Sequence, residues 1–291
     1  MLLPVEYAYY CPKTLTEACE LFRKYNSQAR LLAGGTDLIL AMKREEVQPK
    51  VLIDISRLPE LMVHTVEGNR LRLGAALTFS QVGSSPLVSL WAPALAQAVR
   101  TVGSPQIRNV GTIGGNIATA SPAGDSLPAL VAHQAEALVE NWQGQRRVTI
   151  ESLLQNPDEA LKPGEIIREI QIPAECRPLG YFLKLGRRNA LAISRMSVAI
   201  VVFIQGGLIT RAYLAIGAVA PYPLRLKEAE SIIVAGNLAI ESWSEVVEKA
   251  VVAVRKAVVG RASAPYKTIA IEGLILEALE EIADLCRGTK I

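Results

Sequence analysis

The sequence Leu32-Ala33-Gly34-Gly35-Thr36-Asp37-Leu38 is the first of two glycine loops on which the fold prediction rests, and Gly111-Thr112-Ile113-Gly114-Gly115-Asn116 is the second. The first loop joins a predicted strand at 30–33 to a predicted helix at 37–43, and the second lies in a polar, glycine-rich stretch at 103–124 that we expect to be a loop. Glycine lets backbone N–H groups approach an oxygen-rich anion without a Cβ in the way, and it permits the positive φ that turns consecutive donors toward one point. The pair of loops therefore predicts a binding site for a pyrophosphate.

A single Gly-Gly pair is more often an ordinary tight turn than a binding site, because glycine is a common residue of loops. Here two such loops occur, and Thr, Asn and Asp flank them. The chain lacks both G-x-x-x-x-G-K-[ST] and G-x-G-x-x-G, so it carries neither the P-loop nor the Rossmann fingerprint.

The rest of the chain predicts an α+β protein in three parts. In the first part, apolar residues at helical spacing predict a helix at 14–25, where Thr14 and Glu17 resemble a capping box. A β-branched run at 51–55 predicts a strand, so this part is expected to be a compact βαβ-like unit. The three predicted parts are residues 1–57, 58–175 and 176–291.

The second and third parts differ in the order of their predicted elements. For the second part we expect a strand pair at 61–77, helices at 89–102 and 125–133, and strands at 137–140 and 165–172. For the third part we expect strands at 181–184, 193–204 and 208–217, then helices at 243–259 and 269–286. Strands followed by helices, rather than strict alternation, indicate an antiparallel α+β C-terminal part.

Composition excludes several classes of protein. The chain has 291 residues, of which 50% are hydrophobic and 20% charged, and 31 Lys and Arg against 28 Asp and Glu give a formal charge of +3. The basic residues are scattered, which argues against a nucleic-acid partner. The longest strongly apolar stretch, 198–204, is far shorter than the roughly 20 residues of a membrane span. The N-terminus does not resemble a secretory signal, so we expect a cytoplasmic protein.

Metal ligands are sparse. The 4 cysteines, Cys11, Cys19, Cys176 and Cys286, are far apart, with no C-x-x-C among them. An iron–sulfur cluster or a structural zinc usually needs several thiolates within a few residues of one another. The 2 histidines, His64 and His133, have no second candidate ligand at helical spacing. We therefore expect no metal site in this chain.

The two loops together, followed by Ala120-Ser121-Pro122 and Asp125, resemble the two flavin-binding motifs of the molybdenum hydroxylases. The similarity is to their FAD-binding medium subunit, as in carbon monoxide dehydrogenase and xanthine dehydrogenase. It covers essentially the whole chain, including Tyr181-Phe182-x-Lys184 and Arg187-Arg188. The resemblance implies a two-part FAD-binding domain of the PCMH/vanillyl-alcohol-oxidase type, followed by a smaller α+β domain of the CO dehydrogenase flavoprotein type.

The resemblance also implies roles for individual residues. Backbone amides around Gly34, Gly35 and Thr36 would bind the FAD diphosphate, and the second loop would close over the diphosphate and the ribityl chain. Asp125 would accept hydrogen bonds from flavin-side hydroxyls, and Lys184 would lie near the isoalloxazine ring. The implied cofactor-binding residues are Leu31, Leu32, Ala33, Gly34, Gly35, Thr36, Asp37, Leu38, Val102, Thr112, Ile113, Gly114, Gly115, Asn116, Asp125, Ile167 and Lys184.

The polar residues of this set also have structural interpretations. Asp125 could cap a helix that begins at Ser126, because Asp is a favoured N-cap residue. Lys184 could be a solvated lysine on a strand. Thr36 and Thr112 could be ordinary turn residues.

The function implied by the resemblance is electron transfer, in which the protein supplies binding and electrostatics while FAD carries the redox chemistry. Substrate would be oxidised at a molybdopterin cofactor on a large subunit. Electrons would cross two [2Fe–2S] clusters on a small subunit to FAD, and then reach NAD+ or another acceptor. Lys184 would stabilise the anionic reduced flavin by its charge.

Two alternatives stay open at this point, namely a self-contained FAD oxidoreductase of the same fold and a cofactor-free scaffold. The electron acceptor is open as well. Many bacterial relatives carry an acidic residue after the paired arginines, where this chain reads Asn189-Ala190-Leu191-Ala192-Ile193-Ser194.

Overall fold

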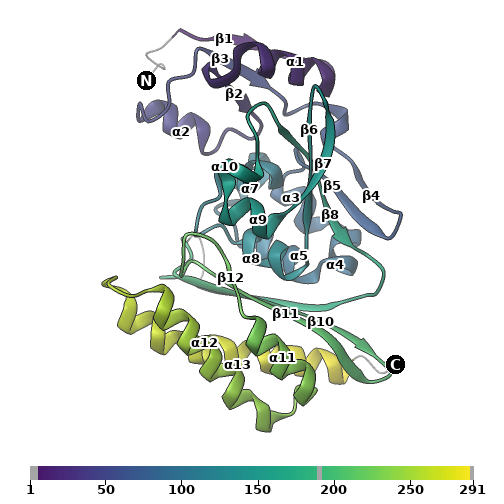
Figure 1. The fold of residues 1–291 in the computed structure, drawn as a ribbon, viewed down its shortest axis with the longest axis vertical. Coiled ribbons are helices and arrows are strands. Elements are labelled where there is room, and N and C mark those ends of the chain that lie inside the picture. Colours follow the sequence, from purple (N-terminus) through teal and green to yellow (C-terminus); the bar gives the residue numbers. More distant parts are fainter. Residues whose placement is uncertain (1–5, 189–191, 289–291) are drawn as a thin grey trace.

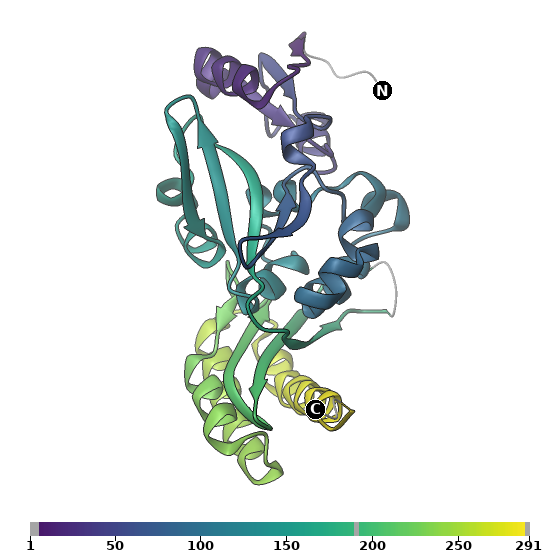
Figure 2. The ribbon, with the colours of Figure 1, turned by 90° about the vertical axis from the view of Figure 1, so that its right-hand side faces the viewer.

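Three sheets follow one another along the long axis of the molecule in the computed structural model, which describes residues 6–188 and 192–288 (Figure 1). A three-stranded sheet lies at the N-terminal end, a five-stranded sheet in the middle, and a four-stranded sheet beside the C-terminal helices. The view from the side shows the same arrangement, with the purple first unit and the yellow C-terminal helix at opposite ends (Figure 2).

The first unit is a small parallel sheet with two helices. Its elements are β1 (Ala8–Tyr10), α1 (Leu15–Tyr25), the 3-10 turn η1 (Asn26–Gln28), β2 (Ala29–Leu32), α2 (Leu38–Lys43) and β3 (Val51–Asp54). The strand order is β1-β3-β2, so the central strand β3 supplies the buried Val51 and Ile53 to the core. The Thr14 hydroxyl caps α1 by accepting from the Glu17 amide at 3.2 Å. The Glu17 carboxylate accepts from the backbone amide of Lys13, and not from that of the N-cap Thr14, so only half of the capping box is formed.

The second unit is an antiparallel five-stranded sheet packed against many short helices. Its strands are β4 (His64–Glu67), β5 (Arg70–Gly74), β6 (Glu136–Asn141), β7 (Gly144–Thr149) and β8 (Ile166–Pro173), in the order β4-β5-β8-β6-β7. Its helices are η2 (Pro59–Leu61), α3 (Phe79–Ser84), α4 (Pro86–Trp91), α5 (Pro93–Arg100), α6 (Pro105–Val110), α7 (Ile113–Thr119), α8 (Ser126–Ala132), α9 (Ile150–Gln155) and α10 (Pro157–Ala160). Several begin at proline, which suits the first position of a helix but interrupts a helix interior.

The third unit is a four-stranded sheet backed by helices. Its elements are β9 (Leu179–Leu185), β10 (Met196–Gln205), β11 (Leu208–Gly217), β12 (Leu224–Arg225), α11 (Lys227–Gly236), η3 (Ile240–Ser242), α12 (Trp243–Ala257) and α13 (Ala264–Gly288). The sheet order is β12-β11-β10-β9, and the pairs are antiparallel.

This last sheet is buried on both faces. Along β10, Ala199 and Val201 belong to the core of the second unit, whereas Val198 and Ile200 belong to the core formed with α12 and α13. Side chains alternate between the two faces of a strand, so burial of both faces requires a continuous apolar run. The sheet thereby joins the C-terminal helices to the rest of the molecule (Figure 1).

The α+β class is confirmed, with antiparallel strands before helices in the third unit, but two local predictions are wrong. The stretch 103–124 is not a loop, because it contains α6 and α7. The helix expected at 89–102 is two helices, which separate at Pro93. No helix in the described part of the chain is long and apolar enough to cross a membrane.

Helices α6 and α7 form because each has an N-cap residue that the glycines obscured. Ser104 accepts from the Ile107 amide at 3.3 Å, and Thr112 accepts from the Gly115 amide at 3.1 Å. A side-chain oxygen at the N-cap satisfies an amide that has no partner inside the helix. The second glycine motif is therefore the first turn of a helix.

Candidate functional site

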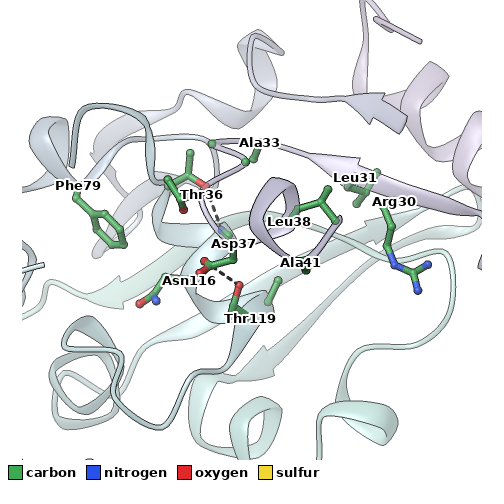
Figure 3. A pocket seen from close by; sticks show the side chains of 15 residues that line it. Arg30, Leu31, Ala33, Thr36, Asp37, Leu38, Ala41, Phe79, Asn116 and Thr119 are labelled. Atoms are coloured by element: carbon green, nitrogen blue, oxygen red, sulfur yellow. Dashed lines mark hydrogen bonds between the residues drawn. The ribbon is translucent and has the colours of Figure 1, made fainter. Parts of the chain in front are cut away.

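A cleft of about 330 Å³ lies where the first glycine loop meets α7 (Figure 3). Ala33, Gly34, Gly35, Thr36 and Asp37 line one side. Thr112, Gly115, Asn116 and Thr119 line the other. The two glycine motifs, far apart in the sequence, are thus brought to one site.

The approach of the loops requires glycine at position 34. A Cβ on Gly34 would lie 2.0 Å from the carbonyl oxygen of Val110, which is backbone and cannot swing away. Gly35 has φ +71°, a conformation that L residues with a side chain rarely adopt. Close backbone contact and positive φ therefore explain this glycine pair.

The second motif uses its glycines differently. A Cβ on Gly114 would lie 2.5 Å from Cβ of Ala75 and 2.8 Å from its carbonyl oxygen, so this glycine packs against the strand end of the second unit. A Cβ on Gly115 would meet only the Thr112 hydroxyl, at 2.8 Å. Thr112 is the N-cap of α7, so it has a structural role at the start of a helix and is not an ordinary turn residue.

The amides of the second motif are already bonded within the protein. The bonds are Ile113 N to Leu77 O (3.0 Å), Gly114 N to Ala75 O (2.9 Å), Gly115 N to Thr112 Oγ1 (3.1 Å) and Asn116 N to Thr112 O (3.0 Å). Buried amides without a partner are unfavourable, so these bonds stabilise the helix end. The second motif offers the cleft few free backbone donors.

The amides of the first loop, in contrast, lack hydrogen-bond acceptors within the described part of the protein. Among the described residues, no protein acceptor is bonded to the amides of Gly34, Gly35 and Thr36. These donors belong to residues that line the cleft, and they are available to an anionic ligand. The first loop is therefore the part of the cleft best suited to hold a diphosphate.

Two polar contacts fix the side of the cleft opposite the loop. Thr119 donates to the Asp37 carboxylate at 3.3 Å and so links α7 to the start of α2 (Figure 3). Ser126 donates to the Asn116 side-chain oxygen at 2.6 Å and links α7 to α8.

A second cavity of about 330 Å³ continues the cleft toward the C-terminal sheet. It shares Thr36, Asp37, Phe79, Asn116 and Thr119 with the first cavity. It then extends to Val102, Asp125, Lys184 and Ser194, the last two from the third unit. The continuous cleft is thus long enough to involve all three units of the fold.

Asp125 anchors the far end of this cleft. Its side chain is only 5% exposed, and its carboxylate accepts from Lys184 at 2.6 Å and from Thr101 at 3.2 Å. The Ser194 hydroxyl donates to the other carboxylate oxygen. Asp125 makes no capping bond to α8, so the capping interpretation of its carboxylate is wrong.

Lys184 is held equally firmly. Its ammonium donates to Asp125 and to the Thr101 carbonyl at 3.0 Å, and its side chain is only 13% exposed. The interpretation of Lys184 as a solvated strand lysine is therefore wrong. The pair places a fixed, nearly buried cation beside the cleft.

The other predicted residues are divided between the cleft and the core. Leu31 and Leu38 line the first cavity, and Val102 lines the second. Ile113 is fully buried in the core of the second unit, and Ile167 on β8 belongs to the same core. Leu32, Ile113, Gly114 and Ile167 are not among the residues that line the two cavities.

Sequence reasoning missed Phe79, Thr101, Thr119 and Ser194. Phe79 lines both cavities although it is 4% exposed, and no glycine or charge pattern marks it. Ser194 lies in the segment 189–194 that follows the paired arginines, and its hydroxyl donates to Asp125. Asn189, Ala190 and Leu191 of that segment lie outside the described residues.

Sequence profiles of two families match almost the whole chain. The FAD binding domain in molybdopterin dehydrogenase matches residues 5–175, and the CO dehydrogenase flavoprotein C-terminal domain matches residues 181–282. The fold is therefore that of an FAD-binding flavoprotein.

Individual proteins agree with the profiles. The chain is 33% identical over 290 residues to the nicotinate dehydrogenase FAD-subunit of Eubacterium barkeri, covering 97% of this chain and 98% of that protein. It is 31% identical over 279 residues to the carbon monoxide dehydrogenase medium chain of Hydrogenophaga pseudoflava, covering 96% and 97%. A solved structure of carbon monoxide dehydrogenase from Hydrogenophaga pseudoflava superposes with a TM-score of 0.88 at 32% identity, covering 96% of this chain and 98% of that one.

The chain belongs to the FAD-binding medium subunits of the molybdenum hydroxylases, of the carbon monoxide dehydrogenase and xanthine dehydrogenase type. It is an oxidoreductase subunit, and its cofactor is FAD. The resemblance seen in the sequence is confirmed.

Proposed function

We propose that FAD lies along the continuous cleft, with its diphosphate at the first glycine loop and its isoalloxazine ring toward Lys184. The observation that carries this proposal is the set of unbonded amides at Gly34, Gly35 and Thr36 in a cleft shared with α7. Such donors fit an anionic diphosphate, because glycine lets the backbone approach its oxygens.

The remaining residues divide into walls and electrostatic groups. The whole of 31–38 and 112–116 is proposed to surround the diphosphate and the ribityl chain, with Val102 and Ile167 as apolar neighbours of the cofactor. Of these, Ile167 lies in the core, so it would support the residues that line the cleft and would not contact the cofactor directly. Asn116 and Thr119 offer side-chain polar groups on the wall opposite the loop.

Lys184 and Asp125 are proposed to tune the cofactor. FAD, when bound, supplies hydride and single-electron chemistry. Asp125 holds the Lys184 ammonium in place, and its carboxylate can accept a hydrogen bond from a flavin hydroxyl in exchange for the Thr101 or Ser194 hydroxyl. A fixed cation near the ring favours the anionic reduced form over the neutral oxidised form.

We further propose that electrons reach the flavin from a [2Fe–2S] small subunit, which receives them from a molybdopterin-binding large subunit. In the described residues, no group of three or more His, Cys, Asp or Glu could hold a metal ion. Cys11, Cys19, Cys176 and Cys286 are free cysteines. Electrons would leave the flavin to NAD+ or another acceptor.

The self-contained oxidoreductase is the weaker proposal. It needs a proton-handling side chain beside the ring, and neither cavity of the cleft has a histidine or cysteine among its described lining residues. The division into domains 1–57, 58–175 and 176–291 and the cytoplasmic location are likewise predictions of the sequence.

The purified chain tests this function directly. We expect flavin absorbance, release of one FAD per chain on denaturation, and reduction by a reduced [2Fe–2S] partner subunit in an anaerobic titration. Reduction by simple organic substrates without any partner would support the self-contained enzyme instead. Absence of FAD after reconstitution with excess cofactor would contradict the proposed cleft.

A further inference from the structure

Helix α5 of the second unit runs beside strand β9 of the third unit and contacts it at both ends. Near the start of the helix, Gly180 lies so close that an added Cβ would be 3.1 Å from the Ala94 nitrogen. At the end of the helix, the Thr101 carbonyl accepts from the Lys184 ammonium at 3.0 Å. Positions in the helix and in the strand therefore advance together, and α5 lies along β9 from Gly180 to Lys184.

Between these two contacts, the side-chain amide of Gln97 bonds to the backbone of β9. The Phe182 amide donates to Gln97 Oε1 at 2.8 Å, and Gln97 Nε2 donates to the Gly180 carbonyl at 3.4 Å. In the described part of the chain β9 is the last strand of its sheet, so the backbone groups on its outer edge have no neighbouring strand. Gln97 supplies to that edge the donor and the acceptor that a neighbouring strand would provide.

The bond at Phe182 lies two residues before Lys184 on the same strand. Side chains alternate along a strand, so Phe182 and Lys184 point to the same side. Both reach the second unit, because Phe182 belongs to its core and Lys184 bonds to Asp125 at 2.6 Å. A short charge-assisted hydrogen bond weakens as its atoms separate, so a shift of β9 at Phe182 would weaken the bond between Lys184 and Asp125.

The end of α5 is also a favourable place for the Lys184 ammonium. The last carbonyls of a helix have no partner within it and carry a partial negative charge. Thr101 closes α5, and its carbonyl accepts from Lys184 while its hydroxyl bonds to Asp125 at 3.2 Å. One helix therefore holds the strand through Gln97 and receives both members of the ion pair at its end.

We propose that Gln97 is a positioning residue for electron transfer. By bonding to the outer edge of β9 it holds the Lys184 ammonium beside Asp125, and it thereby raises the reduction potential of the bound flavin. The inference rests on the proposed function, in which Lys184 lies near the isoalloxazine ring. Gln97 is not among the residues that line either cavity of the cleft, so it acts through Lys184 and not by contact with the cofactor.

Redox titration of the FAD-loaded, full-length chain measures the proposed effect. The variant Gln97→Leu keeps the approximate size of the side chain and removes both of its hydrogen bonds to β9. We expect the affinity for reduced FAD, relative to oxidised FAD, to fall at least about threefold, which makes the potential more negative by roughly 14 mV. The matched control Gln155→Leu removes an exposed amide on α9 and should keep the wild-type potential. An unchanged potential in Gln97→Leu, beside a shifted potential in Lys184→Met, would overturn the proposal.

A double-mutant cycle determines whether Gln97 acts through Lys184. In the Lys184→Met background no ammonium remains to be positioned, so adding Gln97→Leu should leave the potential where Lys184→Met alone places it. A merely structural role would shift the potential equally in both backgrounds. Equal shifts would therefore overturn the proposal.

Exchange of the Lys184 ammonium protons with water, followed by NMR, separates this inference from the proposed function. Exchange should be slow in the wild type, because the ammonium donates to Asp125 and Thr101. We expect it to be at least about tenfold faster in Gln97→Leu and unchanged in Gln155→Leu. Wild-type exchange in Gln97→Leu would overturn the inference. An unchanged potential in Lys184→Met would instead contradict the proposed function, and the exchange rates would still decide whether Gln97 positions Lys184.

Two further variants decide the question if Gln97→Leu does not fold. Gln97→Asn is one methylene shorter and does not reach both backbone groups, so we expect ammonium exchange about tenfold faster than in the wild type. Gln97→Glu keeps the length and the acceptor of the Phe182 amide, so its exchange should stay within about threefold of the wild type. Equal exchange in these two variants would overturn the proposal.

Discussion

The first glycine loop leaves the amides of Gly34, Gly35 and Thr36 without protein acceptors, whereas the second motif bonds each of its first-turn amides within the protein. The two motifs read alike in the sequence and meet in one cleft. Glycine therefore serves two purposes here. In the first loop it exposes donors, and in the second it lets α7 pack against Ala75.

The largest expected effect comes from the contact between the loops. Gly34→Val places a Cβ 2.0 Å from the Val110 carbonyl oxygen, so the first loop must move away from the end of α6. We expect FAD affinity to fall by at least about 1,000-fold, or about 4 kcal/mol, in equilibrium dialysis. The control Gly273→Val adds a side chain where nothing lies within 4 Å and should keep FAD. Wild-type FAD affinity in the Gly34 variant would show that FAD binding does not need the close contact of the first loop with Val110.

Helix α8, which packs behind the second glycine motif, is expected to make the stability of the protein sensitive to acid. His133 ends α8, which packs on α7, and burial lowers its pKa from 6.5 to about 3. A lowered folded-state pKa means that the unfolded chain binds the proton first, so this stability is complete above about pH 6.5 and is lost as the pH falls toward 3. At pH 4 the loss is about 3 kcal/mol.

The variant His133→Leu tests this contribution in urea unfolding at pH 7 and pH 4. We expect its free energy of unfolding to fall by about 3 kcal/mol less than that of the wild type between the two pH values. Burial raises the pKa of Glu169, but its hydrogen bonds to Arg72 and Gln171 lower it further, so that the net pKa lies below the usual value. Protonation of such carboxylates in acid destabilises the wild type and the variant alike. An equal loss of unfolding free energy in the two proteins would show that His133 does not contribute to the acid sensitivity.

A smaller effect is expected at the end of the cleft remote from the loops. Lys184→Met leaves the Asp125 carboxylate with only the Thr101 and Ser194 hydroxyls, so we expect about 2 kcal/mol lower stability. The flavin potential should become more negative, by roughly 30 mV for each 1.4 kcal/mol lost from the reduced form. FAD affinity should change by less than about tenfold, since the diphosphate is proposed to bind at the first loop and not at Lys184.

Lys184→Arg is the control for charge and is expected to keep the flavin potential near that of the wild type. Redox titration with reference dyes measures both variants. An unchanged potential in Lys184→Met would remove Lys184 from the flavin environment.

The smallest effect is expected at the cap of the second motif. Thr112→Val removes the acceptor of the Gly115 amide, which costs about 1 kcal/mol of stability. FAD affinity should change by less than about threefold, or about 0.7 kcal/mol, because we propose that the first loop supplies the diphosphate donors. Thermal unfolding and dialysis measure the two quantities. A loss of FAD as large as that in the Gly34 variant would show that the second motif holds the diphosphate.

The sequence could predict the order of most elements, because periodicity and capping are local signals. It placed α1, β3 and the long strands of the third unit close to their observed bounds. It failed at 103–124, where the glycines concealed the N-caps Ser104 and Thr112. The continuous apolar run of β10 is explained only by its burial between two cores, which is a tertiary property.

The candidate site was only partly accessible to sequence reasoning. The glycine motifs pointed to the cleft because they carry a local signature, but the bonded state of their amides depends on Leu77 and Ala75, which no motif marks. The partners of Asp125 come from the third unit and from the end of α5, so neither its bond to Lys184 nor that to Ser194 could be read from spacing. The place of Phe79 in the cleft is likewise a tertiary property that no spacing in the sequence indicates.

Amide hydrogen exchange, measured residue by residue with and without FAD, tests the role of the first loop most directly. We predict that the amides of Gly34, Gly35 and Thr36 exchange rapidly in the FAD-free protein and are slowed at least about tenfold by FAD, a stabilisation of about 1.4 kcal/mol. Those of Gly114 and Gly115 should be protected in both states. Protection by FAD confined to 113–116, with the first loop unchanged, would contradict the account.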